Sequence, residues 1–356
     1  MLRITLAAPG DIDGVGRRWR GLEAVSTGSF FQSWSWVGCQ FAARYPDPLL
    51  LVAERNGEAL ALALFNRTRV VTGDILWLGE SGDPGLDTVF TEHNGPLVAT
   101  GAPPSLPGAL FDHLHAAPFR RVVWSGIDDA LAARAWTRPG TIRRQADRPA
   151  PYVDFAPIRA AGQDFEASLS SNARYQLRRS LRRFAETGSV SITAASDVPE
   201  ALAWLDVMAA LHQKTWEGRG QPGAFANPFF RVFHAELIAR ALPRGEVELL
   251  RIAAGEEVVG YLYNFLWQGW SFSYQSGFVY PDGDTNRKPG ITCHHLAIAR
   301  HFAAGGAGYD FLAGDARYKT SLANATRRLS WLETGPVWRP TALAARIRAV
   351  LEKYRS

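Results

Sequence analysis

One stretch in the second half of the chain constrains the fold most, because it joins two strand signals to a helix start. Residues 270–278 (WSFSYQSGF) are rich in aromatic side chains and predict a strand. A polar loop follows, and Pro289 with the next glycine opens a helix expected over residues 291–303. A Gly-rich turn then leads to residues 309–312, which predict a second strand. This order of elements is typical of an α/β unit.

The polar loop before the predicted helix has the form of a phosphate-binding turn. Its sequence RKPGIT fits R-x-x-G-x-T. A glycine lets a phosphate approach the backbone, and the first amides of a helix lie at the positive end of its dipole. We therefore identify Arg287, Lys288, Gly290, Ile291 and Thr292 as candidate phosphate-binding residues. An ordinary turn before a helix is the alternative.

The composition is that of a globular protein. The chain has 356 residues, 47% of them hydrophobic and 21% charged, with a net charge of +5. This length allows two domains, and the mild positive charge favours anionic ligands without indicating nucleic acid. Two cysteines, Cys39 and Cys293, cannot form a disulfide framework. With neither a signal-peptide pattern nor a long apolar run, we expect a soluble, cytoplasmic protein.

The two halves of the chain repeat one order of predicted elements. A helix, a polar break and a β-hairpin lie within residues 30–66 and again within residues 225–265. Asn56-Gly57 is the strongest hairpin signal of the first half. A helix and a strand then follow in both halves. Identity between the halves is low, so two unrelated α/β segments are the alternative; a true repeat predicts two similar units that meet near residues 150–163.

Other elements are expected from local patterns alone. Strands are predicted at residues 2–7, 49–54, 58–66, 75–78, 121–124, 141–144, 152–155, 190–194, 246–253, 258–267 and 330–335. Helices are predicted at residues 11–25, 33–44, 106–116, 164–187, 197–216, 227–241 and 341–354.

One predicted helix carries a dense set of arginines, within SSNARYQLRRSLRRF. Arg174, Arg178 and Arg182 recur every four residues, with Arg179 and Arg183 beside them and an apolar stripe opposite. Arginines that face one way without interleaved acids repel one another unless an anion neutralises them. The helix is therefore either an anion-binding surface or a solvated basic face.

Acid/base groups follow the second predicted strand. Asp315, Tyr318 and Lys319 offer a carboxylate, a phenol and an amine at a strand's C-terminal end, which suits proton transfer and equally suits a surface turn. Trp216 and Arg219 end another predicted helix. The motifs of serine hydrolases, P-loop nucleotide-binding proteins and zinc proteases are absent. No metal is expected.

Together these segments resemble the GNAT superfamily of N-acyltransferases, in its FemAB-like, CelD/BcsL-type branch. The resemblance rests on the Arg-rich segment, HQKTWEGRGQPGAF, VVGYLYNF with its following strand, and PGITCHHLAIARHFAAGGAGYDFLAGDARYK. It covers residues 165–335, and the first half resembles the family only as a degenerate copy. The implied fold is α/β with mixed sheets, in two tandem GNAT-like units. Residues 1–155 would form the degenerate unit, 156–340 the acyltransferase unit and 341–356 a C-terminal helix.

The resemblance implies transfer of an acyl group from acyl-CoA, with acetyl-CoA as the expected donor, directly to an amine. The pyrophosphate would lie at the RKPGIT loop, and a splayed strand pair around residues 270–278 would hold the pantetheine. The family's loop usually ends in a small residue where this chain has Thr292. By association with the family, the acceptor is an amino sugar or another intermediate of exopolysaccharide or cell-envelope synthesis.

The resemblance also implies roles for single residues. Strand amides near Ser276 and Gly277 would polarise the thioester carbonyl. Asp315 is the first candidate for the base, and Tyr318 or Tyr274 would return a proton to the thiolate. The candidate substrate-binding residues are Trp216, Arg219, Lys319, Arg174 and Arg178.

Three alternatives stay open. FemAB-like relatives take aminoacyl groups from tRNA, which the Arg-rich helix could contact, although the modest charge and the lack of a coiled-coil insertion argue against it. A long-chain acyl group could pass to a lipid amine, with peripheral membrane contact. A catalytically inactive pair of GNAT units could bind a nucleotide. The first half lacks an RKPG equivalent, so we expect one donor site per chain.

Overall fold

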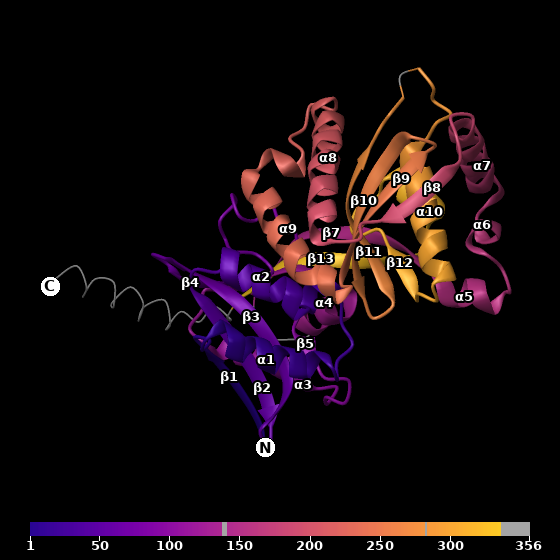
Figure 1. The fold of residues 1–356 in the computed structure, drawn as a ribbon. Coiled ribbons are helices and arrows are strands. Elements are labelled where there is room, and N and C mark those ends of the chain that lie inside the picture. Colours follow the sequence, from indigo (N-terminus) through magenta and orange to yellow (C-terminus); the bar gives the residue numbers. More distant parts are fainter. Residues whose placement is uncertain (137–140, 282, 336–356) are drawn as a thin grey trace.

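A computed structural model of the chain describes residues 1–136, 141–281 and 283–335. The helix expected over residues 341–354 lies outside these ranges. Within them the strands form one mixed 13-stranded sheet in the order β1-β2-β3-β4-β6-β13-β7-β12-β11-β10-β9-β8, with β5 paired to β3. Figure 1 shows the two halves of this sheet as two units, indigo to purple and orange to yellow.

The first unit follows its local sequence signals closely. Asp11 caps α1 by accepting the Gly14 amide, and Ser33 caps α2 by accepting the Trp36 amide. Asn56 (φ 54°) and Gly57 (φ 86°) make the predicted hairpin turn. Its elements are β1 (Leu2–Ala7), α1 (Ile12–Glu23), α2 (Trp34–Arg44), β2 (Pro48–Arg55), β3 (Glu58–Val70), β4 (Gly73–Leu78), β5 (Leu97–Val98), α3 (Leu106–Ala116), β6 (Arg121–Asp128) and α4 (Asp129–Trp136).

The second unit repeats this order after a linking strand and three helices. The linking elements are β7 (Thr141–Asp154), α5 (Phe155–Ala160), α6 (Phe165–Ser168) and α7 (Ser171–Ala185). The repeat is β8 (Val190–Ala194), α8 (Val198–Glu217), α9 (Pro228–Ala241), β9 (Val247–Ala254), β10 (Glu257–Trp267), β11 (Trp270–Phe278), α10 (Pro289–Ala303) and β12 (Gly308–Asp310). The chain continues with α11 (Arg317–Leu322) and β13 (Ala325–Gly335).

Strand pairing confirms that the two units share one topology. In the first unit β1, β2, β3 and β4 pair antiparallel in sequence, and β4 pairs parallel with β6. In the second unit β8, β9, β10 and β11 pair in the same way, and β11 pairs parallel with β12. The predicted α/β fold with tandem units is therefore confirmed.

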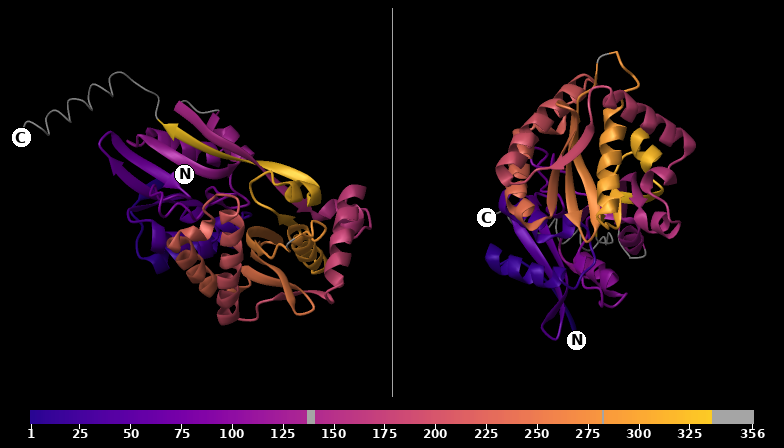
Figure 2. Two further views of the ribbon diagram at one scale, coloured as in Figure 1. Left: turned by 90° about the horizontal axis from the view of Figure 1, so that it is seen from above. Right: turned by 45° about the vertical axis from the view of Figure 1, so that its right-hand side comes forward.

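The last strand of each unit is exchanged with the other unit. β7 follows the first unit in the chain but pairs antiparallel with β12 of the second. β13 follows the second unit but pairs antiparallel with β6 of the first, and it also pairs with β7 along its length. Figure 2 shows β13 in yellow beside the magenta β7, running between the units. The division into residues 1–155 and 156–340 stays a proposal, since these two strands cross it.

The largest core joins the units. Phe30 of the first unit stacks on Phe265 of β10 with ring centroids 4.2 Å apart, and Trp36 of α2 contacts Phe233 of α9 at 5.4 Å. α8 and α9 cover this face of β9–β11, whereas α10 and α7 cover the other (Figure 1). Burying this many aromatic rings between the units favours one rigid body over two independent domains.

Several local predictions were wrong. The helix expected over residues 164–187 is broken into α6 and α7, because Ser170 caps a new helix by accepting the Ala173 amide. The strand-like segments 141–144 and 152–155 are one strand, β7. The strand expected over residues 309–312 ends at Asp310, since Leu312 has φ 60°. None of the described helices combines the length and hydropathy needed to cross a membrane.

Candidate functional site

The second unit contains a fork between two parallel strands. β11 and β12 pair only from Trp270/Gly308 to Phe272/Asp310, after which β12 ends and β11 continues to Phe278. A register shift against β10 makes Tyr274 a bulge at the point of separation. Within the described residues, β11 therefore has a strand edge without a strand neighbour beyond Phe272, as the predicted splayed pair requires.

The start of α10 lies beyond this fork and has no side-chain cap. Its first helical hydrogen bond runs from the Thr292 amide to the Lys288 carbonyl at 3.1 Å, so the amides of Gly290 and Ile291 precede the helical ladder. A Cβ built on Gly290 would meet the Phe278 ring at 3.4 Å, an ordinary contact. Packing within the protein therefore does not require glycine at this position. Close approach of a ligand to the backbone would explain it.

The side chains around this helix start are held by α7. Ser180 accepts the Lys288 amide at 2.8 Å and lies 2.8 Å from the Thr292 hydroxyl. Arg287 donates to the Thr187 hydroxyl at 2.9 Å, and the Lys288 ammonium donates to Gln176 at 2.7 Å. Thr292, the departure from the family pattern, is therefore part of the buried contact between α7 and α10.

Carboxylates from outside α7 neutralise part of its basic face, which the sequence did not reveal. Arg178 pairs with Glu166 of α6 at 2.5 Å, and Arg183 pairs with Asp284 at 3.1 Å. Arg174 donates to the Ala167 carbonyl at 3.2 Å. Arg174 and Arg178 thus contact α6, whereas Lys319 contacts the turn after β12. Arg182 is exposed, with no carboxylate partner among the described residues.

Tyr318 of α11 lies with Arg219 and Tyr280 near the end of β11. Its ring stacks on His294 of α10 with centroids 5.0 Å apart. Burial raises the pKa of Tyr318, the neighbouring Tyr280 raises it further, and the Arg219 guanidinium opposes them. Arg219 also lies 5.6 Å from the Trp216 ring centroid. The structure therefore brings together three of the predicted residues: Tyr318, Arg219 and Trp216.

The end of β11 is packed against α8. His212 donates from Nδ1 to the Ser276 carbonyl at 3.1 Å and accepts the Ala224 amide at Nε2 at 3.3 Å, which is the neutral tautomer. Burial lowers the pKa of His212, in agreement with that form. A Cβ on Gly277 would lie 2.4 Å from the Met208 carbonyl oxygen. Gly277 is therefore fixed by helix packing, whatever else it contacts.

Tyr274 lies in the core instead of at the surface of the site. It is 4% exposed, its ring stacks on Phe90 at 4.3 Å, and its hydroxyl donates to the Phe90 carbonyl at 3.1 Å. Burial raises the pKa of Tyr274 well above its ordinary value. Of the two tyrosines predicted as proton donors, Tyr318 is the better placed, because the Tyr274 hydroxyl is already committed to a backbone acceptor.

Asp315 and Lys319 differ in their exposure and in their contacts. Asp315 is exposed. The Lys319 ammonium donates to the carbonyls of Leu312 at 3.3 Å and Ala313 at 2.8 Å, and burial lowers the pKa of this lysine. Lys319 thus holds the turn that follows β12.

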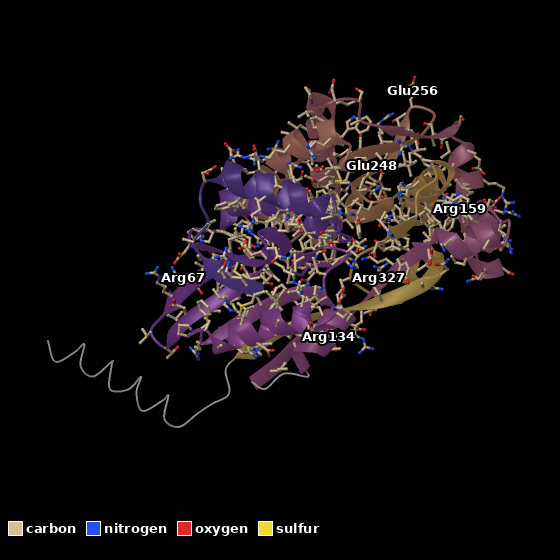
Figure 3. All side chains as sticks on the ribbon, turned by 90° about the horizontal axis from the view of Figure 1, so that it is seen from below. Arg67, Arg134, Arg159, Glu248, Glu256 and Arg327 are labelled. Atoms are coloured by element: carbon tan, nitrogen blue, oxygen red, sulfur yellow. The ribbon has the colours of Figure 1, made fainter. Side chains whose placement is uncertain are left out.

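Sequence reasoning missed two buried residues in a first-unit loop for which no helix or strand was predicted. Glu92 accepts the Ala313 amide at 2.6 Å, and His93 Nε2 lies 3.2 Å from Asp310 Oδ2 at the end of β12. Arg327 of β13 lies 3.6 Å from the same carboxylate, at the junction of the two units (Figure 3). The only feature of the segment TEHNG that could have marked it as functional is its polarity. Its local sequence gives no indication of a partner more than 200 residues away.

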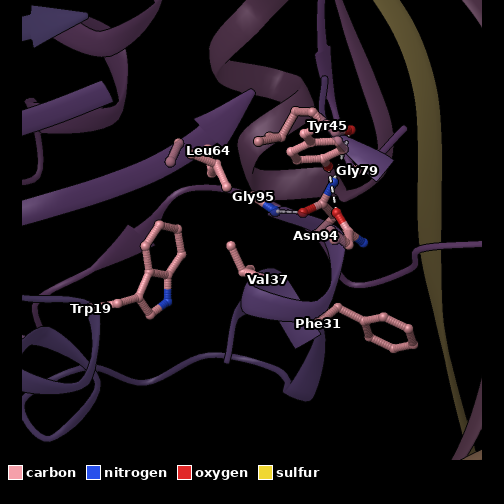
Figure 4. A pocket seen from close by; sticks show the side chains of 11 residues that line it. Trp19, Phe31, Val37, Tyr45, Leu64, Gly79, Asn94 and Gly95 are labelled. Carbon is pink, nitrogen blue, oxygen red and sulfur yellow. Dashed lines mark hydrogen bonds between the residues drawn. The ribbon is translucent and has the colours of Figure 1, made fainter. Parts of the chain in front are cut away.

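The corresponding fork of the first unit is closed. Asn94 donates from Nδ2 to the carbonyls of Leu78 on β4 at 3.1 Å and Ser125 on β6 at 3.0 Å, and its amide donates to Gly126 at 2.9 Å. The cavity beside it measures about 10 Å³, enough for about one water (Figure 4). Asn94 therefore occupies the position between strands that the second unit leaves open.

A larger hollow of about 280 Å³ lies at the other end of β11, lined by Trp267, Trp270 and His301 among others. It is at the β10–β11 turn, whereas the fork and the α10 start lie toward Phe278. The predicted donor residues do not line it.

Comparison with known protein families finds a match, which lies in the second half of the chain. Residues 171–320 match the family described as "Acetyltransferase (GNAT) domain". That match begins with α7 and ends within α11, so it contains the open fork and the α10 start. No curated protein matches the chain.

Three solved structures share the fold along nearly the whole chain. FemX has a TM-score of 0.59 at 10% identity and covers 96% of this chain and 98% of its own. The C-terminal domain of a putative lysylphosphatidylglycerol synthetase from Agrobacterium fabrum has a TM-score of 0.55 at 12% identity, with 96% and 97% covered. L-PGS from Bacillus licheniformis has a TM-score of 0.54 at 12% identity, with 96% of each chain covered.

Proposed function

We propose that this chain transfers an acyl group from acyl-CoA to an amine, and that the second unit is the catalytic unit. One observation carries the proposal: β11 and β12 separate after Phe272, within the segment that matches the GNAT family, and the uncapped start of α10 lies beyond the fork. An extended pantetheine arm can pair with a strand edge as an added strand does. The helix start suits the pyrophosphate.

The reaction proceeds by direct attack. A neutral amine adds to the thioester carbonyl, whose developing oxyanion is stabilised by strand amides near Ser276 and Gly277. The C–S bond then breaks as the C–N bond is retained. Tyr318 gives its proton to the departing thiolate and regains one from the nitrogen, so that the products are an amide and free CoA.

The acceptor is proposed to enter beside Trp216, Arg219 and Lys319. Arg219 lies over the Trp216 ring and interacts with Tyr280, and its guanidinium offers hydrogen-bond donors to hydroxyl or anionic groups. This suits an amino sugar or a sugar-linked intermediate of exopolysaccharide or cell-envelope synthesis, an acceptor class that otherwise rests on the family resemblance.

An aminoacyl group carried by tRNA is the second candidate donor. The observation that favours it is the exposed Arg182 on α7, the helix that holds the Lys288 loop in place. Phosphate contacts by such arginines would make binding fall steeply with added salt.

Calorimetric titration with acetyl-CoA, palmitoyl-CoA, charged tRNA and a cyclic dinucleotide separates these functions. We expect acetyl-CoA to bind and to raise the free energy of unfolding by about 2.7 kcal/mol at a hundredfold excess over Kd. Thiol release with a panel of amines then tests transfer. Preference for palmitoyl-CoA would indicate a long-chain donor. If only tRNA binds, and its binding weakens with salt, the donor is an aminoacyl-tRNA instead of acyl-CoA. Binding of a donor without transfer to any amine would refute an enzymatic role.

A further inference from the structure

We propose that Glu92, contributed by the first unit, takes the proton from the attacking amine in the site of the second unit. The inference rests on the acyl-transfer function proposed above. It assigns the base to a residue outside the segment that matches the GNAT family.

The loop that carries Glu92 packs against β11 at the point where β11 and β12 separate. The Phe90 ring stacks on the Tyr274 ring with centroids 4.3 Å apart, and the Phe90 carbonyl accepts a hydrogen bond from the Tyr274 hydroxyl at 3.1 Å. The His93 ring lies 5.6 Å from the Phe272 ring. Glu92, between these two contacts, reaches across to the turn after β12. The carboxylate therefore lies at the fork, on the side of β11 that faces α8 and α9.

The carboxylate is anchored by one oxygen only. Oε2 accepts the Ala313 amide at 2.6 Å, whereas no described residue donates to Oε1. Glu92 is 5% exposed, so its side chain is confined to one position and has little access to bulk water. An anchored carboxylate with one oxygen left over can accept a proton directly or through a single water.

Titratable groups of α11, β12 and β11 lie around Glu92. Lys319 of α11 donates to the same Ala313, Asp310 of β12 pairs with His93, and Tyr274 of β11 lies close by. Burial raises the pKa of Glu92, the Ala313 amide, His93 and Lys319 lower it, and Asp310 raises it. The net rise makes this carboxylate a stronger base than an exposed one.

Asp315, the candidate named from sequence, lacks these features. It is exposed, and its charge acts on Lys319, whose ammonium is bound by the carbonyls of the turn after β12. As an exposed surface side chain, Asp315 is not confined to one position. Glu92 is held by the fold at the fork itself.

The proton balance is complete without another reactant. The acceptor arrives as an ammonium ion and gives one proton to Glu92, which becomes a neutral carboxylic acid. The free amine attacks the thioester, and its second proton leaves with the thiolate through Tyr318. Glu92 then returns its proton to solvent as the products depart.

The test compares the wild-type protein with Glu92→Gln, using acetyl-CoA and two kinds of probe nucleophile. Glucosamine and ethanolamine are protonated at neutral pH and need a base, whereas hydroxylamine is largely neutral and does not. Gln keeps an acceptor for the Ala313 amide. Glu80→Gln is the matched control, because Glu80 lies in the same loop and burial likewise raises its pKa, but its hydrogen bond is to Ser125 of the first unit.

At pH 7 we expect Glu92→Gln to slow transfer to the ammonium probes about 100-fold or more, and transfer to hydroxylamine less than about threefold. Raising the pH should restore the ammonium probes, since the amine is then neutral in solution. Glu80→Gln should match the wild type. Equal losses with both kinds of probe, an unchanged pH profile, or a wild type that acylates hydroxylamine but neither ammonium probe would each overturn the assignment. A wild type that neither binds acetyl-CoA nor acylates any probe would instead refute the proposed function.

Discussion

The Glu92 carboxylate accepts the Ala313 backbone amide at 2.6 Å, although the two residues are 221 positions apart. This contact joins the loop of one unit to the strand end of the other. It also keeps a carboxylate buried, which is costly whenever that group is ionised.

Glu92→Gln should change how stability depends on pH. The pKa of Glu92 is 4.5 before folding and is raised by burial in the fold, so the folded state binds more protons between the two values. The free energy of unfolding of the wild type should therefore fall as pH rises above 4.5 and through the folded pKa. The Glu92→Gln variant has no carboxylate at this position, so its free energy of unfolding should not show this fall. Urea denaturation of both proteins from about pH 4.5 to 8 measures the difference, and parallel curves would contradict it.

Tyr318→Phe should separate chemistry from binding. Loss of a proton donor lowers kcat by about 100-fold, while the Kd for acetyl-CoA stays within about threefold. Tyr274→Phe is the matched variant: it removes one buried hydrogen bond, to Phe90, and should cost about 1 kcal/mol of stability with a smaller effect on kcat. Steady-state kinetics and calorimetry on both proteins make the comparison. A larger loss of kcat for Tyr274→Phe would reverse the two roles.

Gly290→Ala tests the helix start as the donor site. The added methyl group meets Phe278 at 3.4 Å, so the fold should tolerate it, and alanine is favoured over glycine in helices. The same methyl group lies beside the free amides and should weaken acetyl-CoA binding about tenfold by hindering the pyrophosphate. Calorimetry gives the Kd and thermal unfolding gives the control. Unchanged affinity would place the pyrophosphate elsewhere.

Asn94→Ala tests why the first unit has no donor site. The change leaves the carbonyls of Leu78 and Ser125 without their donor and should cost about 1–3 kcal/mol of stability. The calorimetric stoichiometry of acetyl-CoA should remain one per chain, because the first unit also lacks an RKPG loop. Two molecules bound to the wild type would show that both forks accept the donor.

Local sequence signals were sufficient for most elements. Asp11, Ser33 and Asn56-Gly57 act as expected, because caps and tight turns depend on neighbours within a few residues. The α10 start was found for the same reason. These signals also exposed the repeat, since each unit carries its own set.

Contacts between distant residues were beyond the sequence. The hydrogen bonds of Glu92 to Ala313 and of Arg178 to Glu166 depend on how the units and helices pack. The sequence separation of neither pair predicts the contact. Tyr274 shows the converse. The family resemblance implied a proton-transfer role for it, whereas the packing of Phe90 on its ring places it in the core.

Because β7 and β13 each pair with the other unit, the protein cannot be cut between its units without removing a strand from each sheet half. A fragment that begins at residue 156 would lack β7, leaving the edge of β12 bare, and a fragment that ends at residue 155 would leave β6 without β13. Bare strand edges recruit other chains and promote aggregation. Expression of either half should therefore give insoluble material, whereas the two halves produced together can supply each other's missing strand.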